Sequence, residues 1–163
     1  MRRLSRVTLI LVVCLGLAAS SAAAQTAKDM VGSWSLVSDV NTSSDGRKVE
    51  PFGANPQGTA IFGSDGRFAI VISRADLAKF ASDNRMQGTP DENRAIVQGS
   101  IGFFGSYLVA NGAVIQHIDG GTWPSWIGTD QKRTITSFTG TDQTWTTIAS
   151  FGGTSVLQWR RAK

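Results

Sequence analysis

Two side chains in this sequence stand out as candidates for acid–base or anion-binding chemistry. His117 is the only histidine, and imidazole titrates near neutral pH. It is therefore either a general base or ligand-binding donor, or a hydrogen-bonded structural residue. An inward-facing Arg133 would cost several kcal/mol if unpaired, so it would need a carboxylate such as Asp119, waters or an anionic ligand. The alternative is an outward, solvated Arg133.

The sequence offers few candidate residues for metal binding or for nucleophilic catalysis. The single cysteine is Cys14, and the aspartates and glutamates show no metal-ligand spacing, so we expect no metal and no cofactor. The sequence has no Gly-x-Ser-x-Gly nucleophile elbow. No acid–base pair with separated pKa values is evident, which favours binding over catalysis.

The aromatic residues divide into two groups. Trp34 and Trp159 are expected to brace one end of the fold. Trp123 and Trp126 lie in a loop containing Gly and Pro, where they either line an opening or cover the core. We list the candidate ligand-binding residues as His117, Arg133 and Tyr107 for polar contacts, with Trp123, Trp126 and Trp145 as apolar walls.

The first 24 residues are typical of an export signal. Arg2, Arg3 and Arg6 precede a largely apolar run, and small residues lead up to Ala24, after which we expect cleavage. A retained membrane anchor is the alternative, but the apolar run is shorter than the ~20 residues that a spanning helix needs. Residues 1–24 are therefore predicted to be a signal peptide, residues 25–163 one domain, and the protein periplasmic or secreted.

Signal removal changes the charge balance. Cleavage removes three of the 16 basic residues. The remaining 13 basic and 12 acidic residues give a net charge of about +1. A nucleic-acid partner then lacks the positive surface that phosphate binding requires. Cys14 also leaves, so the exported chain would have no disulfide and no thiol chemistry.

Short β-rich runs follow one another with turn residues between them. They are residues 31–40, 58–63, 67–73, 103–110, 113–119, 133–139, 144–150 and 155–161. Tight turns such as Asn111-Gly112, which suits a type I′ hairpin, join four pairs of them. The pattern predicts an all-β, up-and-down antiparallel barrel of about eight strands, with one or two short helices, at 74–80 and 92–100, between the third and fourth runs. A barrel of this size has room for one small ligand.

Several segments resemble the lipocalin-like domain family, small calycin-related barrels that are mostly bacterial and fungal. Residues 31–37 resemble its opening Gly-x-Trp strand, and residues 51–58 resemble its Pro-Phe-Gly-x-x-Pro-x-Gly segment. Asp65-Gly66-Arg67 and the closing Trp159-Arg160-Arg161 occur in the family's order. The resemblance implies a barrel enclosing a cavity, and Arg161 stacked on Trp34 would fit a calycin-type closure.

From these observations we expect an exported, monomeric, lipocalin-like barrel that binds a small apolar or amphiphilic molecule. One alternative is a small barrel isomerase, cyclase or hydratase using His117 with Arg133 or Asp119. Another is an envelope protein-interaction module with a filled barrel. Strand alternation alone does not settle which faces point inward.

Overall fold

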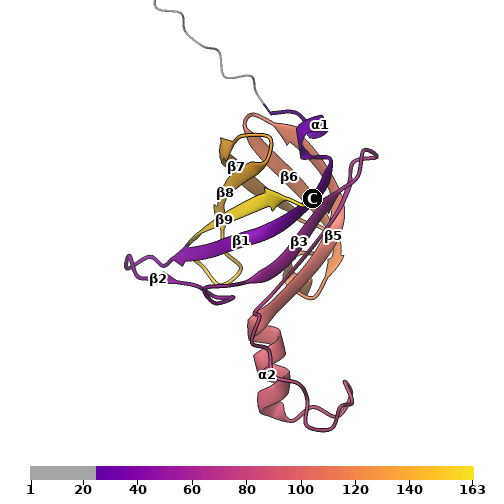
Figure 1. Ribbon diagram of the computed structural model, residues 1–163, viewed down its shortest axis with the longest axis vertical. Coiled ribbons are helices and arrows are strands. Elements are labelled where there is room, and N and C mark those ends of the chain that lie inside the picture. Colours follow the sequence, from indigo (N-terminus) through magenta and orange to yellow (C-terminus); the bar gives the residue numbers. More distant parts are fainter. Residues whose placement is uncertain (1–24) are drawn as a thin grey trace, which may run out of the picture.

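The computed structural model describes residues 25–163, and the predicted signal peptide, residues 1–24, lies outside the described residues. The described chain forms a β barrel (Figure 1). Its strands are β1 (Gly32–Thr42), β2 (Lys48–Val49), β3 (Gln57–Phe62), β4 (Arg67–Ser73), β5 (Ser100–Ala110), β6 (Ala113–Gly121), β7 (Asp130–Phe138), β8 (Asp142–Ile148) and β9 (Thr154–Arg161). The helices are α1 (Ala27–Met30), α2 (Pro90–Gly99) and the 3-10 turn η1 (Pro124–Trp126).

Pairing of the first strand with the last closes the barrel. Neighbouring strands run antiparallel from β3 to β9, and β1 pairs with both β3 and β9, with Trp34 opposite Arg161 and Thr42 opposite Thr154. The ring therefore has eight strands, and β2 is a short addition to the end of β1. Closure leaves no long unpaired edge among these eight strands, as the predicted up-and-down barrel requires.

The Asn111-Gly112 turn shows why this chain makes tight hairpins. Both residues have positive φ angles, 51° and 69°, which is the backbone of a type I′ turn. This turn joins β5 to β6 at the end of the barrel where α1 lies (Figure 1). We refer to that end as the closed end and to the opposite end, where α2 lies, as the mouth.

The helical region differs from the prediction. Because the short strand β2 adds one to the strand numbering, the segment predicted to be helical lies between β4 and β5. Only α2 forms in this segment. Thr89 and Glu92 build a capping box, with the Glu92 backbone N–H donating to Thr89 Oγ1 at 3.3 Å and the Thr89 N–H to Glu92 Oε2 at 2.7 Å. The helix predicted at 74–80 was wrong: Arg74 N–H still donates to the Gly99 carbonyl, which prolongs the strand ladder instead.

The core fills the closed half of the barrel with aromatic side chains. Phe62 packs edge-on against Tyr107, with ring centroids 4.9 Å apart, and Trp145 lies 5.3 Å from Trp159. All four are buried. Truncating a buried Phe or Trp to Ala costs about 3–5 kcal/mol, so this cluster is a main source of stability.

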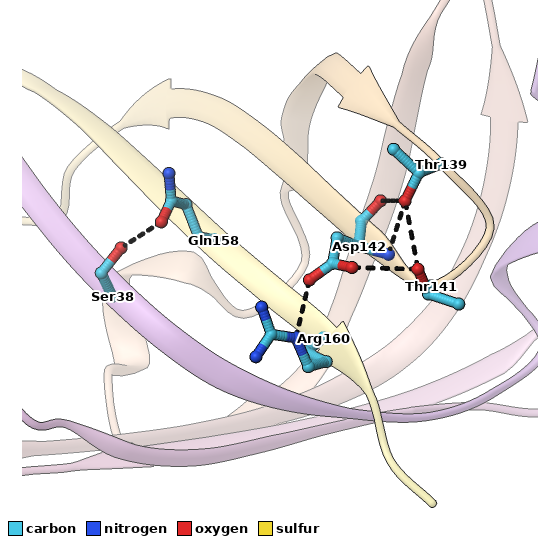
Figure 2. A network of polar contacts seen from close by, with 6 residues as sticks. All are labelled: Ser38, Thr139, Thr141, Asp142, Gln158 and Arg160. Atoms are coloured by element: carbon cyan, nitrogen blue, oxygen red, sulfur yellow. Dashed lines mark hydrogen bonds and ion pairs between the residues drawn. The ribbon is translucent and has the colours of Figure 1, made fainter.

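Polar contacts on the outer face link the strands at and beside the β1–β9 closure (Figure 2). Arg160 Nε donates to Asp142 Oδ1 at 2.8 Å between β9 and β8, and Ser38 Oγ donates to Gln158 Oε1 at 3.1 Å between β1 and β9. Because these groups are solvent-exposed, they contribute to register more than to stability.

Candidate ligand-binding cavity

Two adjoining hollows lie at the mouth half of the barrel. The inner cavity, of about 50 Å³, is inside the barrel, and its polar lining residues are Asp39, Arg133, Thr147, Ser150 and Ser155. The outer chamber, of about 590 Å³, is lined by Pro51, Phe52, Arg74, Ile96, Val97, Gln98, Ser100, Ile101, Thr122, Trp123, Ser150 and Phe151. The two hollows share Phe52, Ile101, Ser150 and Phe151, so they are neighbours along one path into the barrel.

Arg133 is the positive charge of the inner cavity. It is 5% exposed, and its Nε donates to Gln116 Oε1 at 3.2 Å while its Nη1 donates to Thr147 Oγ1. Its guanidinium carbon lies 5.2 Å from the ring centroid of Trp126 and 5.8 Å from that of Phe103. Burial lowers the pKa of Arg133 to about 10, so the side chain remains charged at neutral pH.

Thr147 is held in the right orientation to accept this bond. Its hydroxyl donates to the Lys132 carbonyl at 3.0 Å, which leaves a lone pair of Oγ1 for Arg133. Both hydrogen-bond acceptors of Arg133 are therefore neutral. Among residues 25–163, no ion pair joins its guanidinium to a carboxylate.

Asp39 is the second ionisable group of the inner cavity. It is 6% exposed, and Ser155 Oγ donates to its Oδ1 across the β1–β9 pair. Burial raises the pKa of Asp39, an effect opposed by the Ser155 hydrogen bond and by the charge of Arg133. Burial thus disfavours the charged form of Asp39, whereas the charges of Asp39 and Arg133 favour each other.

Three buried nitrogens of the barrel interior find no acceptor among residues 25–163. Gln116 and Gln143 each use their amide oxygen to accept a bond, from Arg133 and from Trp145 Nε1 at 2.9 Å. Their amide nitrogens, and Trp159 Nε1, are buried without a partner. A buried donor left unpaired costs about 1–3 kcal/mol, so an acceptor placed here would be stabilising.

The predicted tryptophan walls lie at different depths. Trp145 is buried and lines the inner cavity together with Trp126, whose ring is half-buried. Trp123 is 40% exposed and lines the outer chamber. The structure therefore brings Arg133, Trp126 and Trp145 together and places Trp123 at the mouth.

The other two predicted polar residues lie elsewhere. His117 is on the outer face, half exposed, with its Nδ1 2.8 Å from Asp130 Oδ1. Its neighbours in β6, Gln116 and Ile118, are the residues that point inward. Tyr107 is buried at the closed end, where its hydroxyl donates to the Gly63 carbonyl at 3.0 Å and lines neither hollow.

The suggested Arg133–Asp119 pair was wrong. Asp119 shares the outer face with His117, and its Oδ2 accepts from Arg67 Nη1 at 2.7 Å. The residue that faces Arg133 across the cavity is Asp39, which the sequence analysis missed. A bulge between Leu36 and Ser38 shifts the alternation of β1, so the odd-numbered Asp39 points inward after the even-numbered Trp34 and Leu36.

Neither a metal cluster nor a membrane-spanning helix is found in the described chain. Across residues 25–163, no three His, Cys, Asp or Glu side chains gather closely enough to hold a metal ion. Within the same residues, no helix has the length and apolar character needed to cross a bilayer.

These features define a small, closed antiparallel β barrel with an inner cavity that holds Arg133 and Asp39 and a larger chamber at its mouth. Residues 31–162 match the model of the lipocalin-like domain family, and the chain belongs to that family. No curated protein matches the chain in sequence.

Three of the solved structures that match the chain are designed β barrels. A redesigned β barrel is 16% identical, with a TM-score of 0.45, and covers 88% of this chain and 100% of its own. A second redesigned barrel, mFAP1 bound to DFHBI, is 20% identical, with a TM-score of 0.40 and coverages of 83% and 97%. A de novo designed fluorescence-activating barrel is 16% identical, with a TM-score of 0.41 and coverages of 83% and 96%.

Proposed function

We propose that this protein binds a small apolar or amphiphilic molecule through the mouth of its barrel. The observation that carries the proposal is the outer chamber of about 590 Å³ adjoining an inner cavity that holds Arg133 and Asp39. Ligand pockets in proteins have volumes of roughly 300–1,000 Å³ and are mostly apolar with a few polar groups. The outer chamber has such a volume, and the inner cavity supplies the polar groups.

The chamber provides enough apolar surface for useful affinity. Burying ~250 Å² of apolar ligand surface at ~25 cal/mol/Å² gives ~6 kcal/mol before ordering costs. A single polar contact adds ~1–3 kcal/mol. Micromolar binding therefore needs no specialised chemistry.

Neither alternative function gains support. The enzyme hypothesis paired His117 with Arg133 or Asp119, but His117 and Asp119 lie on the outer face while Arg133 lies inside. His117 Nε2 lies 4.0 Å from Asp119 Oδ1, but this pair is on the outer face and cannot act on a substrate inside the barrel, where Arg133 lies. The filled-barrel hypothesis is compatible with the inner cavity, which is too small for a whole ligand, but it leaves the outer chamber of about 590 Å³ without a role.

Binding can be tested with a variant that narrows the path between the two hollows. Ser150 lines both hollows in an exposed turn between β8 and β9, so Ser150→Phe adds bulk there without disturbing the core. Calorimetric titration with decanol should show binding to the wild type and much weaker binding to this variant. The matched control is Ser64→Phe, in the exposed hairpin at the closed end, which should bind as the wild type does.

Two results would overturn the proposal. One is the absence of decanol, decanoate and decylammonium binding to the wild type. The other is equal loss of affinity in both phenylalanine variants. Native mass spectrometry of the protein purified from its own cell envelope would identify a retained natural ligand.

We further propose that the protein acts as a monomer in the periplasm or outside the cell. The basic and apolar pattern of residues 1–24 supports export, and cleavage after Ala24 would leave Gln25 as the first residue. N-terminal sequencing of protein from a periplasmic extract tests the export proposal. A mature chain still beginning at Met1, or recovery only from the cytoplasm, would contradict it.

A further inference from the structure

We propose that the ligand is an amphiphile with a small anionic head of the carboxylate type, which enters the inner cavity and binds Arg133 while its apolar tail fills the outer chamber. The inference rests on the proposed function and adds to it the chemical class of the ligand and its orientation. Three independent observations lead to it: the charge of the cavity, its donor surplus and the sizes of the two hollows.

The first observation is the charge of the inner cavity. Among residues 25–163, Arg133 and Asp39 are the two charged residues that line the inner cavity, and neither forms an ion pair there. Arg133 is satisfied by two neutral oxygens, and its Nη2 makes no hydrogen bond within the described chain. A buried guanidinium is stabilised far more by an anion than by neutral partners, and its fork matches a carboxylate.

The donor surplus points the same way. Trp159, which lines the inner cavity, and Gln116, which contacts Arg133, both have a buried nitrogen without an acceptor. A cationic head would add donors to a site already rich in them. The one carboxylate in the cavity lining, Asp39, already accepts the Ser155 hydroxyl and, within residues 25–163, accepts no hydrogen bond from Arg133. The interior therefore favours an acceptor-rich head.

The sizes of the two hollows determine the orientation of the ligand, with its head inside and its tail at the mouth. The inner cavity of about 50 Å³ has room for roughly three to five water molecules, which suits a carboxylate of three heavy atoms. An alkyl tail or ring system does not fit beside it, whereas the outer chamber is more than ten times larger. Phe52 and Ile101 border both spaces, so a tail leaving the inner cavity passes directly between apolar side chains.

The experiment compares three ligands that share one tail. Decanoate, decanol and decylammonium are titrated into the wild-type protein by calorimetry at neutral pH. We expect decanoate to bind about tenfold or more tightly than decanol, because the carboxylate is itself charged and can accept two hydrogen bonds from the guanidinium fork, whereas the alcohol oxygen is neutral. Decylammonium should bind weakest.

Arginine variants test whether Arg133 causes the preference. In Arg133→Gln the ratio of decanoate to decanol affinity should fall towards one. Arg133→Lys, which keeps the charge but loses the fork, should retain part of it. The control is Arg67→Gln, on the outer face beside Asp119, in which the ratio should not change. The ligand comparison on the wild type does not depend on any variant folding.

The possible failures are distinguishable. If all three ligands bind equally, or decylammonium binds best, the head-group inference is overturned while the proposed function stands. If Arg133→Gln and Arg67→Gln show the same ratio as the wild type, Arg133 is not the anchor. If none of the three ligands binds, the proposed function itself fails.

Discussion

The guanidinium carbon of Arg161 lies 4.2 Å from the ring centroid of Trp34, and this stack joins the last strand of the barrel to the first. Arg161 also donates to the carbonyls of Asp29, Val31 and Gly140 at 2.8–2.9 Å. Trp34 Nε1 in turn donates to the Met30 carbonyl at 2.8 Å. The N-terminal segment is thereby held across the closed end, as the family resemblance implied.

Removing this arginine should destabilise the barrel. Arg161→Ala loses the stack on Trp34 and three hydrogen bonds from a charged donor, and we expect a loss of about 2–4 kcal/mol in the free energy of unfolding. Urea denaturation followed by far-UV circular dichroism measures it. The neighbouring Arg160→Ala removes an exposed ion pair with Asp142 and should change stability little. Equal effects of the two substitutions would show that the closed end does not depend on Arg161.

Gly105 should tolerate no side chain. An added Cβ would overlap the backbone carbonyl of His117, at the bulge where β5 and β6 change register. We expect Gly105→Ala to cost about 3 kcal/mol, the upper end for overpacking, because neither backbone can move away freely. Gly102→Ala on the same strand meets Val71 at an ordinary 3.7 Å and should stay within about 0.5 kcal/mol of the wild type. Thermal melting of both variants tests this difference in stability. Similar melting temperatures of the two variants would contradict the prediction.

The buried acid Asp39 predicts how stability depends on pH. Because burial raises its pKa in the folded state, the fold binds its proton more tightly than the unfolded chain does. Its contribution to stability is therefore fully present below the unfolded pKa of 3.8 and is lost as pH rises through the folded value. The charged group facing it in the cavity is Arg133, which opposes this shift without cancelling it.

Asp39→Asn isolates this effect, since the amide oxygen can still accept the Ser155 hydroxyl. We expect the variant to melt at a higher temperature than the wild type near pH 7, and the difference to shrink as pH approaches 3.8 and below. Calorimetric melting at several pH values measures the difference. A difference that grows as the solution becomes more acidic would reverse the sign and refute the assignment.

Sequence patterns were sufficient to predict the barrel architecture of the molecule. Turn residues such as Asn111-Gly112 determine the hairpins locally, and their succession along the chain leads to the eight-stranded barrel. The Trp34–Arg161 closure followed from the resemblance. The inward position of Arg133 was one of two open alternatives, because β7 carries polar residues on both faces.

The interior of the site was harder to predict, because β bulges change which residues point inward. The bulge after Leu36 turns Asp39 into the barrel, and the one after Ile135 turns Ser137 outward. His117 attracted attention as the only histidine, yet Gln116, its unremarkable neighbour, is the residue that contacts Arg133. The helix predicted at 92–100 was placed too late by two residues at its start, since α2 begins at Pro90 after its cap Thr89.

A crystal structure with 10-bromodecanoate tests the account most directly, because the anomalous signal of bromine locates the tail independently of the head. We predict the carboxylate within hydrogen-bond distance of Arg133 and the bromine in the outer chamber beside Trp123 and Val97. Bromine inside the barrel with the carboxylate in solvent, or a ligand bound only on the outer face, would contradict it.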